Sequence, residues 1–234
     1  MLNSCFRSKN QFKLSNLRLL HTTMVVKGRP EDAKLISKEA VKDTSSCKWI
    51  GLEKIKYRDP NGGEREWDSA IRMTRTTGEV DGIGILAILK YGDGKPDEIV
   101  LQKQFRPPVE GVCIEMPAGL IDADEDIETA ALRELKEETG YIGKIIGASP
   151  VIFNDPGFTN TNLSLVTVEI DMNKPENQNP QSELEDNEFI ECFNVPLKEF
   201  PEKMVELDKQ GYKLDARVQN VAQGITLARQ YNLN

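Results

Sequence analysis

Residues 119–141, GLIDADEDIETAALRELKEETGY, decide how this chain is organised. The second half of the stretch predicts a helix. Apolar residues recur there at the spacing of one buried helical stripe: Ile127, Ala130, Ala131 and Leu135. The stretch therefore places one face of a helix against a core and leaves its charged residues on the remaining faces.

The ends of this helix also have sequence signals. Asp122 with Glu125 three residues on predicts a capping box, and Asp124 is a competing cap. Acidic residues in the first turn suit the positive end of the helix dipole. Gly140 stands where a left-handed C-terminal cap is needed.

Acidic side chains are stacked on the second half of the helix. Glu134 and Glu138 are separated by one turn, about 40° apart around the axis, and Glu137 lies beside them. Such like-charge pairs cost roughly 0.2–0.5 kcal/mol each. Carboxylate oxygens are the ligands of Mg²⁺ and Mn²⁺, and Mg²⁺ is often shared with a substrate phosphate. The alternative is a solvated acidic face in which Arg133 makes a surface ion pair with Glu137.

The register of these residues resembles the box of the Nudix hydrolases. Gly119, Glu125, the pair Arg133-Glu134, a bulky apolar residue, two more glutamates and Gly140 occupy its fixed positions. Tyr141 departs mildly from the aliphatic residue at its last position. The resemblance implies an α/β (α+β) Nudix fold, a mixed β-sheet sandwiched between α-helices. It also implies Mg²⁺-dependent cleavage of a nucleoside diphosphate linked to another group.

Composition narrows the alternatives. The 234 residues are 38% hydrophobic and 29% charged, as in ordinary globular proteins. No apolar run is long enough for a membrane span. The net charge of −8 argues against broad nucleic-acid binding, so an anionic substrate would need local arginines and a metal. His21 is the only histidine and the four cysteines lack zinc-site spacing, which leaves acid–base work to carboxylates, lysine or tyrosine.

The first 24 residues are basic and contain no acid. Arginine, serine and leucine without acids are typical of a mitochondrial presequence. The alternative is a disordered tail upstream of a second start at Met24. We therefore expect a cytoplasmic or nuclear protein, part of which residues 1–24 direct to mitochondria.

The rest of the chain alternates strand and turn signals. We assign residues 1–30 to a leader or tail, 31–80 to a small antiparallel β unit with one wet face, and 81–234 to the main domain. The apolar run 82–89 predicts a strand covered on both faces. Further strands are expected at 49–57, 64–74, 98–105, 145–153, 163–170 and 188–195, a mobile loop at 173–187, and helices at 201–209 and 215–231. Asp215 is the expected cap of the last helix, whose packing stripe is Val218, Ala222, Ile225 and Leu227.

Residues 47–221 show a closer resemblance, to the ADP-ribose pyrophosphatase branch of the Nudix hydrolases. Its marks are Lys48-Trp49, Arg65-Glu66-Trp67, Lys103-Gln104-Phe105-Arg106-Pro107-Pro108, Cys113 through Asp122, Asp155-Pro156-Gly157 and Asp215-Ala216-Arg217-Val218. This resemblance implies hydrolysis of ADP-ribose to AMP and ribose 5-phosphate by a homodimer with a swapped N-terminal unit.

The resemblance also implies which residues hold metal and substrate. Two or three Mg²⁺ ions, or Mn²⁺, would be bound by the Ala118 carbonyl, Glu115, Glu134 and Glu138. Glu137 is an alternative to Glu138, and Glu115 has a plain surface alternative. Arg133 is expected to orient a glutamate.

The resemblance also implies which residues around these ligands bind the substrate. Arg72 and Arg106 would clamp the diphosphate, since guanidinium forks match phosphate oxygens. Trp49 and Trp67 would sandwich adenine, one from each subunit, with core or interface packing as the alternative. Leu120 and Asp155 would line the substrate; Asp155 and Phe158 equally suit a simple turn.

The catalytic base is expected just before the last strand. The resemblance assigns it to Glu188, with Glu185, Asp186 and Glu191 as rivals. Glu134 and Glu138 complete the expected catalytic set. Alternative functions are cleavage of other nucleoside diphosphate sugars or of oxidised nucleotides such as 8-oxo-dGDP, a non-catalytic ADP-ribose sensor, and an RNA cap hydrolase.

Overall fold

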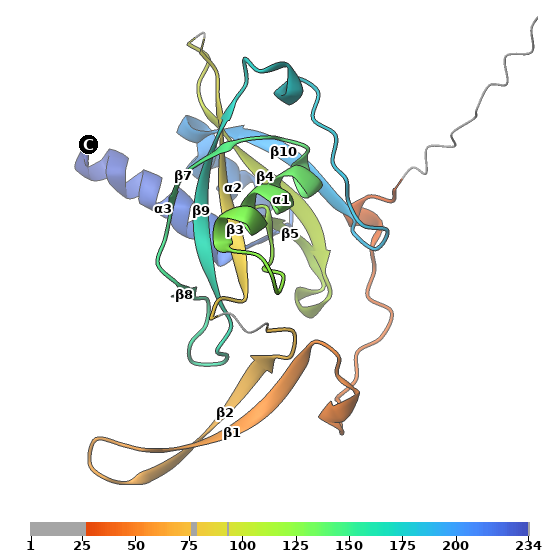
Figure 1. The fold of residues 1–234 in the computed structure, drawn as a ribbon, viewed down its shortest axis with the longest axis vertical. Helices are drawn as coiled ribbons and strands as arrows, with labels where there is room; N and C mark the ends of the chain where they lie inside the picture. Colours follow the sequence, from red (N-terminus) through yellow and green to blue (C-terminus); the bar gives the residue numbers. More distant parts are fainter. Residues whose placement is uncertain (1–26, 76–78, 93, 234) are drawn as a thin grey trace, which may run out of the picture.

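The computed structural model describes residues 27–75, 79–92 and 94–233. The presequence-like segment 1–24 lies outside these residues. The strands and helices follow in chain order (Figure 1): β1 (Ile50–Arg58), β2 (Glu64–Arg72), β3 (Gly82–Lys90), β4 (Glu98–Arg106), β5 (Gly111–Glu115), β6 (Ala118–Leu120), α1 (Ile127–Thr139), β7 (Lys144–Ala148), β8 (Ile152–Phe153), β9 (Asn162–Asp171), β10 (Ile190–Pro196), α2 (Phe200–Lys209), β11 (Lys213–Leu214) and α3 (Ala216–Tyr231). Short 3-10 turns include η1 (Pro30–Asp32) and η4 (Pro175–Asn177).

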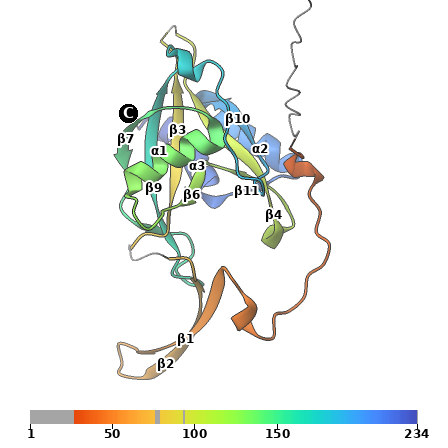
Figure 2. The same cartoon turned by 45° about the vertical axis from the view of Figure 1, so that its right-hand side comes forward.

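A mixed sheet forms the main body. β3 runs parallel to β9 and antiparallel to β4 and β6, while β10 pairs with the other edge of β4. α1 lies on one face of this sheet, and α2 and α3 lie on the other (Figure 2). The expected mixed sheet between helices is therefore confirmed.

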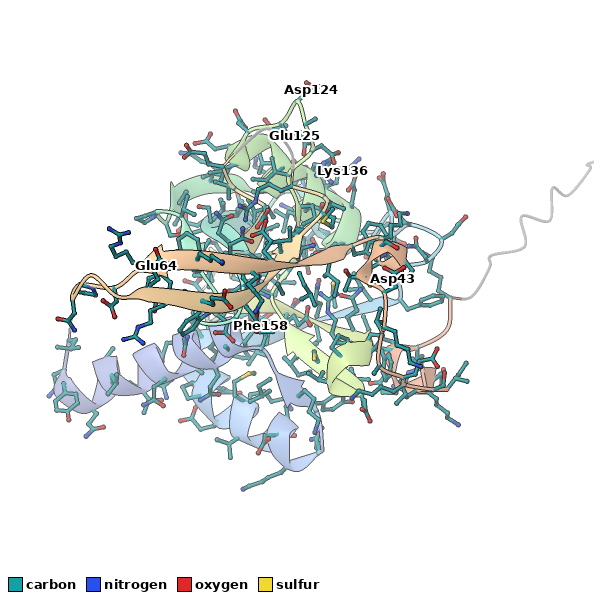
Figure 3. The ribbon with its side chains drawn as sticks, turned by 90° about the horizontal axis from the view of Figure 1, so that it is seen from below. Asp43, Glu64, Asp124, Glu125, Lys136 and Phe158 are labelled. Carbon is teal, nitrogen blue, oxygen red and sulfur yellow. The ribbon has the colours of Figure 1, made fainter. Side chains whose placement is uncertain are left out.

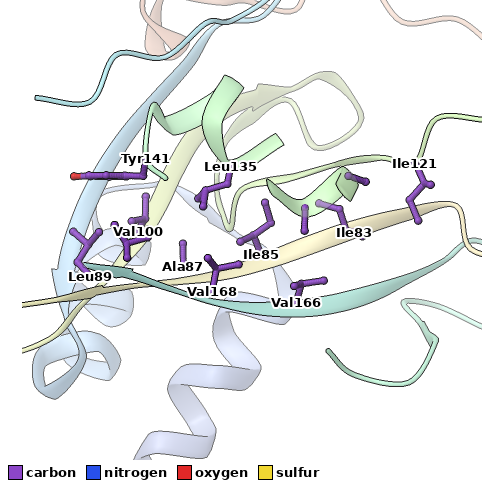
Figure 4. Packing of buried hydrophobic residues seen from close by; sticks show 13 residues of the cluster. Ile83, Ile85, Ala87, Leu89, Val100, Ile121, Leu135, Tyr141, Val166 and Val168 are labelled. Atoms are coloured by element: carbon purple, nitrogen blue, oxygen red, sulfur yellow. The ribbon is translucent and has the colours of Figure 1, made fainter. Parts of the chain in front are cut away.

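Alternate residues of β3 serve two different cores. Ile83, Ile85, Ala87 and Leu89 pack with the α1 side chains (Figure 4), and Leu86 and Ile88 pack on the α2 and α3 side. This explains why the strand is an almost continuous apolar run, since both of its faces are covered. The sheet is thereby fixed between two helical layers, which gives α1 a rigid support.

The helix ends differ in part from expectation. Gly140 caps α1 with φ 76°, as predicted. The N-terminal cap is Asp126, whose carboxylate accepts a hydrogen bond from the Thr129 N–H at 2.8 Å. The assignments to Asp122 and Asp124 were wrong because residues 122–125 form a turn of their own, closed by the Glu125 N–H and the Asp122 carbonyl.

Other elements match with two corrections. Asp215 caps α3 as expected, but Leu227 is 40% exposed and leaves the predicted stripe. Leu227 follows Ile225 by two residues and therefore lies about 200° away from it around the helix axis. The single strand expected at 145–153 is split into β7 and β8 around Pro150, which has no N–H to donate to a strand ladder.

The hairpin β1–β2 is a separate two-stranded sheet. It projects from one end of the body (Figure 1), and most side chains of both strands are exposed. The expected single wet face is therefore wrong for one chain alone: both faces are open, because no second layer of the described chain covers either. The hairpin contacts the body through its second strand, where the Ala70 N–H donates to the Phe158 carbonyl at 3.0 Å and the Trp67 side chain to the Gly157 carbonyl at 3.1 Å; Phe158 lies beside the hairpin in Figure 3.

The segment predicted as a mobile loop contains firm contacts. Asn177 is fully buried, and its side chain bonds both the N–H and the carbonyl of Ile142 at 2.9 Å. The Glu183 N–H donates to the Glu137 carbonyl at 2.7 Å. The segment is thus tied to the C-terminal end of α1. Within the described residues, no helix combines the length and the apolar character that a bilayer crossing requires.

Candidate active site

The three glutamates of α1 differ in exposure. The Glu138 residue is 5% exposed, the Glu134 side chain 14% and the Glu137 side chain 42%. Because Ala130, Ala131 and Leu135 face the core, the next residues around the helix emerge at its edge and not in open solvent. A purely solvated acidic face, the alternative left open by the sequence, does not describe Glu134 and Glu138.

Glu138 is a buried acid without a basic partner among the described residues. Its carboxylate accepts hydrogen bonds from the Ala118 N–H at 2.9 Å and from the Gln102 amide at 3.4 Å. Burial and the negative charges of Glu134 and Glu188 together raise the pKa of Glu138 to about 8, against the lowering effect of the hydrogen bonds from the Ala118 N–H and the Gln102 amide. A nearby cation would therefore stabilise the charged form of the Glu138 carboxylate.

Glu134 shares the guanidinium group of Arg133 with two other acidic side chains. The Arg133 guanidinium donates to Glu134 at 2.8 Å, to Glu137 at 3.0 Å and to Glu125 at 2.7 Å. Burial nevertheless raises the pKa of Glu134 above its ordinary range. Arg133 therefore contacts a glutamate of the cradle, as expected, and also makes the ion pair with Glu137 that the sequence left as the alternative.

Gly119 makes room for Glu134. A Cβ atom at this position would stand 1.9 Å from Oε1 of Glu134 and 2.0 Å from its Cδ. A side chain there would displace the carboxylate, which ends in flexible bonds and can move away cheaply. The first fixed glycine of the stretch is therefore a requirement of the acidic cradle, defined here as Glu115, Ala118, Glu134 and Glu138.

Glu115 and Arg106 are paired with each other. The guanidinium of Arg106 makes a two-pronged contact with the Glu115 carboxylate, at 2.8 and 2.6 Å. Glu115 is buried at the end of β5, and its hydrogen bond raises the pKa of Arg106. The structure thus joins the expected metal ligand to the expected diphosphate clamp.

An arginine-rich pocket of about 370 Å³ opens beside the cradle. Three guanidinium groups contribute to it, from Arg72, Arg106 and Arg217. The Nε of Arg72 is buried without a hydrogen-bond partner among the described residues, as expected for a donor that awaits an anion. The remaining lining includes Ala118, Gly119, Leu120, Asn154 and Asn162. Arg72, Arg106, Ala118 and Leu120 of the predicted site therefore meet in one cavity.

Trp49 and Trp67 stand apart from this pocket. They lie on or beside the hairpin, 56% and 49% exposed. The Trp67 N–H donates to the Gly157 carbonyl at 3.1 Å, so this ring sits against the Asp155-Pro156-Gly157 turn. Asp155 itself accepts turn hydrogen bonds through its carbonyl, while its neighbour Asn154 lines the pocket. One chain alone does not bring the two tryptophans onto the pocket.

Glu188 lies in a turn before β10. Its carboxylate accepts a hydrogen bond from the Glu185 N–H at 3.0 Å, and its charge acts on both Glu134 and Glu138. Among its rivals, Glu191 pairs with Lys103 at 3.0 Å and with Arg29 at 3.8 Å. Glu191 is thus paired with cations, whereas Glu188 makes no ion pair within the described residues.

The donor set suits a hard divalent cation. Within the described ranges, no three acidic, thiol or imidazole side chains converge as a finished metal cage, because Glu115 is turned to Arg106 and Glu134 to Arg133. Yet the buried Glu138 has two acidic neighbours and no ion pair in the same ranges, which a bound cation would relieve. Carboxylate and carbonyl oxygens are ligands that Mg²⁺ and Mn²⁺ prefer.

Two site residues were not assigned a role from the sequence. Gln102 is a buried amide in the otherwise apolar run of β4, and that polar interruption was the available signal. Arg217 is held by Asp215 through two contacts of 2.8 Å, which leaves its Nη1 beside Gly84 on the pocket wall. Its only signal was its place in a motif after the expected cap Asp215.

This combination of a mixed sheet, a glutamate-bearing helix and a neighbouring arginine pocket defines a class of diphosphate-cleaving enzymes. Residues 81–215 match the NUDIX domain family, and the chain belongs to this family. It is 73% identical to an ADP-ribose pyrophosphatase of Saccharomyces cerevisiae, over 97% of this chain and 98% of that protein. It is also 37% identical to an ADP-sugar pyrophosphatase of Mus musculus, over 74% of this chain and 80% of that protein.

Proposed function

We propose that this protein hydrolyses the diphosphate of ADP-ribose, so that water and ADP-ribose yield AMP and ribose 5-phosphate. The observation that carries this proposal is the position of the acidic cradle beside the arginine pocket, with β6 (Ala118–Leu120) between them. The names of the yeast and mouse relatives support an ADP-linked substrate.

A divalent metal would complete the cradle. The Ala118 carbonyl, Glu115, Glu134 and Glu138 are the residues that would hold Mg²⁺ or Mn²⁺. When bound, the metal supplies positive charge to the diphosphate oxygens and lowers the pKa of a coordinated water. A cation in the cradle would stabilise the charged form of Glu138, whose pKa burial raises in the free protein.

The arginines bind and orient the diphosphate. Arg72 offers a buried N–H that has no partner in the described part of the chain, and Arg106 can exchange the Glu115 carboxylate for a phosphate. In that exchange Glu115 is freed to face a metal. The Arg106–Glu115 pair therefore stabilises both groups in the free protein. When substrate and metal bind, the pair would separate, with Arg106 on a phosphate and Glu115 on the metal.

Glu188 is the proposed general base. It lies near the cradle on a turn outside α1, so it can accept the proton of the attacking water while Glu134 and Glu138 remain charged ligands. Its hydrogen bond from the Glu185 N–H fixes the carboxylate in the turn.

The hairpin is the proposed dimer contact. Its exposed apolar side chains include Ile50 at 56% and Leu52 at 65%, a surface that a second copy would cover. In a homodimer with the hairpin swapped, one tryptophan of each subunit would stack on adenine. Light scattering should give twice the 26.3 kDa of one chain, and a Leu52→Asp variant should give a monomer with a raised KM.

A direct assay tests the function. Purified protein with Mg²⁺ and ADP-ribose should produce AMP and ribose 5-phosphate, identified by chromatography. A parallel panel of ADP-glucose, GDP-mannose and 8-oxo-dGDP separates an ADP-ribose enzyme from a broader one, which the mouse relative's name favours as the second candidate. Tight binding of ADP-ribose with no product would instead identify a sensor.

A further inference from the structure

The N-terminal strap, residues 27–33, lies against the turn that carries Glu188. The two segments are about 155 residues apart in the chain but adjacent in space, at the edge where β10 begins (Figures 1 and 2). The strap is outside the matched family region 81–215. Its contacts are therefore an addition to the domain that holds the cradle.

Lys27 fastens this turn through its backbone. Its ammonium group donates to the carbonyl of Leu184 at 2.9 Å, to that of Glu188 at 3.3 Å and to that of Glu185. An ammonium has three N–H donors, so one side chain uses its whole donor capacity on a single turn. A surface lysine with one carboxylate partner would give no such geometric restriction.

The same turn sets the direction of the Glu188 side chain. The Glu188 N–H donates to the Glu185 carbonyl at 3.1 Å, and the Glu188 carboxylate accepts from the Glu185 N–H at 3.0 Å. Lys27 thus holds both ends of this arrangement: the Leu184 carbonyl, whose peptide group carries the Glu185 N–H, and the Glu185 carbonyl, which also accepts from the Glu188 N–H. Movement of Lys27 would release the turn and, with it, the carboxylate.

The strap itself is anchored. Pro30 is buried, and Glu31 accepts from Lys103 at 3.0 Å and from the Tyr212 hydroxyl at 2.9 Å. Burial would raise the pKa of Glu31, but these hydrogen bonds outweigh it and lower the pKa to about 2. Lys103 also bonds Glu191 on β10, so strap, β4 and β10 share one charged network.

We infer that Lys27 is a positioning residue for catalysis: it holds the 184–188 turn so that the Glu188 carboxylate faces Glu134 and Glu138. This inference rests on the proposed function, in which Glu188 is the base. Lys27 touches no reacting atom, and it acts through the turn.

The full-length protein with Lys27→Met is the main test. The methionine keeps an unbranched stem and removes the donors. We expect kcat to fall between about fivefold and about fiftyfold, less than the ~100-fold that a misplacement of about 1 Å can cost. KM should stay within about twofold, since Lys27 does not line the pocket. Amide hydrogen exchange should quicken at residues 184–188.

Two further variants supply controls. Lys27→Arg keeps several donors and should recover most of the lost kcat. Lys34→Met changes an exposed lysine nearby in the same N-terminal segment and should leave both kcat and exchange unchanged. Unchanged kcat and exchange in Lys27→Met, or an equal loss in Lys34→Met, would overturn the inference.

A double variant separates this inference from the proposed function. In a Glu188→Gln background, Lys27→Met should cause no further loss of kcat. An undiminished further loss would show that Lys27 does not act through Glu188, with the proposed base intact. Wild-type kcat in Glu188→Gln alone would instead overturn the base itself, and the inference with it.

Discussion

Helix α1 and the β1–β2 hairpin were both expected to contribute to one site, but they differ in burial and in their contacts with the rest of the chain. Glu138 on α1 is 5% exposed and is supported by β4 and β6, whereas Trp49 and Trp67 near the hairpin are half exposed. The chain's own core thus positions the groups for chemistry. The groups for adenine recognition stand on a sheet that one copy does not cover.

The largest expected effect is the loss of the buried acid. Glu138→Gln should lower kcat about 10³-fold or more, in the range known for removal of central electrostatic and acid–base groups. The structural support of α1 should survive, since Gln keeps the size of the side chain. Steady-state rates with ADP-ribose measure the effect. Glu128→Gln, an exposed acid on the same helix, is the matched control and should retain the wild-type rate.

Gly119→Ala tests whether the cradle depends on close approach. The added methyl group would overlap the Glu134 carboxylate, so we expect kcat to fall roughly 100-fold, as for a reacting group displaced by about 1 Å. The melting temperature should change little, because the displaced atoms end a flexible side chain. Gly147→Ala, where the new methyl group meets nothing within 4 Å, is the control. A normal rate in Gly119→Ala would mean that the position of Glu134 is unimportant.

Substitution of the tryptophans tests whether the hairpin contributes to adenine recognition. Trp49→Ala and Trp67→Ala should each raise KM by about tenfold to about fiftyfold with little change in kcat, because stacking of a base on an aromatic ring is worth about 1–3 kcal/mol. Stability should be nearly unchanged, since both rings are half exposed. Kinetics across ADP-ribose concentrations provide the readout. A fall in kcat at constant KM would place these residues in the chemical step.

The smallest effect concerns pH and the metal-free protein. Folding raises the pKa of Glu138 from its ordinary value of 4.5 to about 8. Between these pH values the folded state binds more protons than the unfolded state, so the free energy of unfolding falls as pH rises. Glu138→Gln removes this dependence. At pH 8 in EDTA, the variant should be more stable than the wild type by roughly 1–3 kcal/mol.

Urea unfolding at pH 5 and pH 8 measures this difference. It should nearly vanish at pH 5, where the Glu138 carboxyl is protonated in the folded protein. Added Mg²⁺ at pH 8 should stabilise the wild type and leave Glu138→Gln unaffected. Equal pH dependence of the two proteins would show that Glu138 carries no buried charge.

Much of the body could be predicted from local pattern. The 3.6-residue period marked the buried stripe of α1, and the unbroken apolar run marked β3 as a strand covered on both faces. Leu227 was misplaced because it follows Ile225 by only two residues and so lies about 200° around the helix from it, off the buried stripe. The cap was misplaced because three aspartates precede α1, at 122, 124 and 126, and the separate turn at residues 122–125, whose Glu125 is held by Arg133, leaves Asp126 to cap the helix.

The site was harder to predict where it depends on distant contacts. Gln102 supports Glu138 from a position 36 residues earlier, and the Arg106–Glu115 pair joins side chains of the neighbouring strands β4 and β5. In the register of these two strands Glu115 lies opposite Gln102 and Arg106 opposite Gly111, so strand pairing alone does not predict the Arg106–Glu115 contact. Neither contact has a local signature. Lys27, which bonds a turn about 155 residues away, carries no sequence signal at all.

The central claim is that Glu134 and Glu138 hold a divalent metal beside the arginine pocket. Titration of Mn²⁺ into the full-length protein, followed by the electron paramagnetic resonance of the free ion, tests it most directly. Wild type should bind Mn²⁺, more tightly when a non-hydrolysable ADP-ribose analogue is present, and Glu134→Gln/Glu138→Gln should not bind in the same concentration range. Equal binding by the wild type and the double variant would contradict the account.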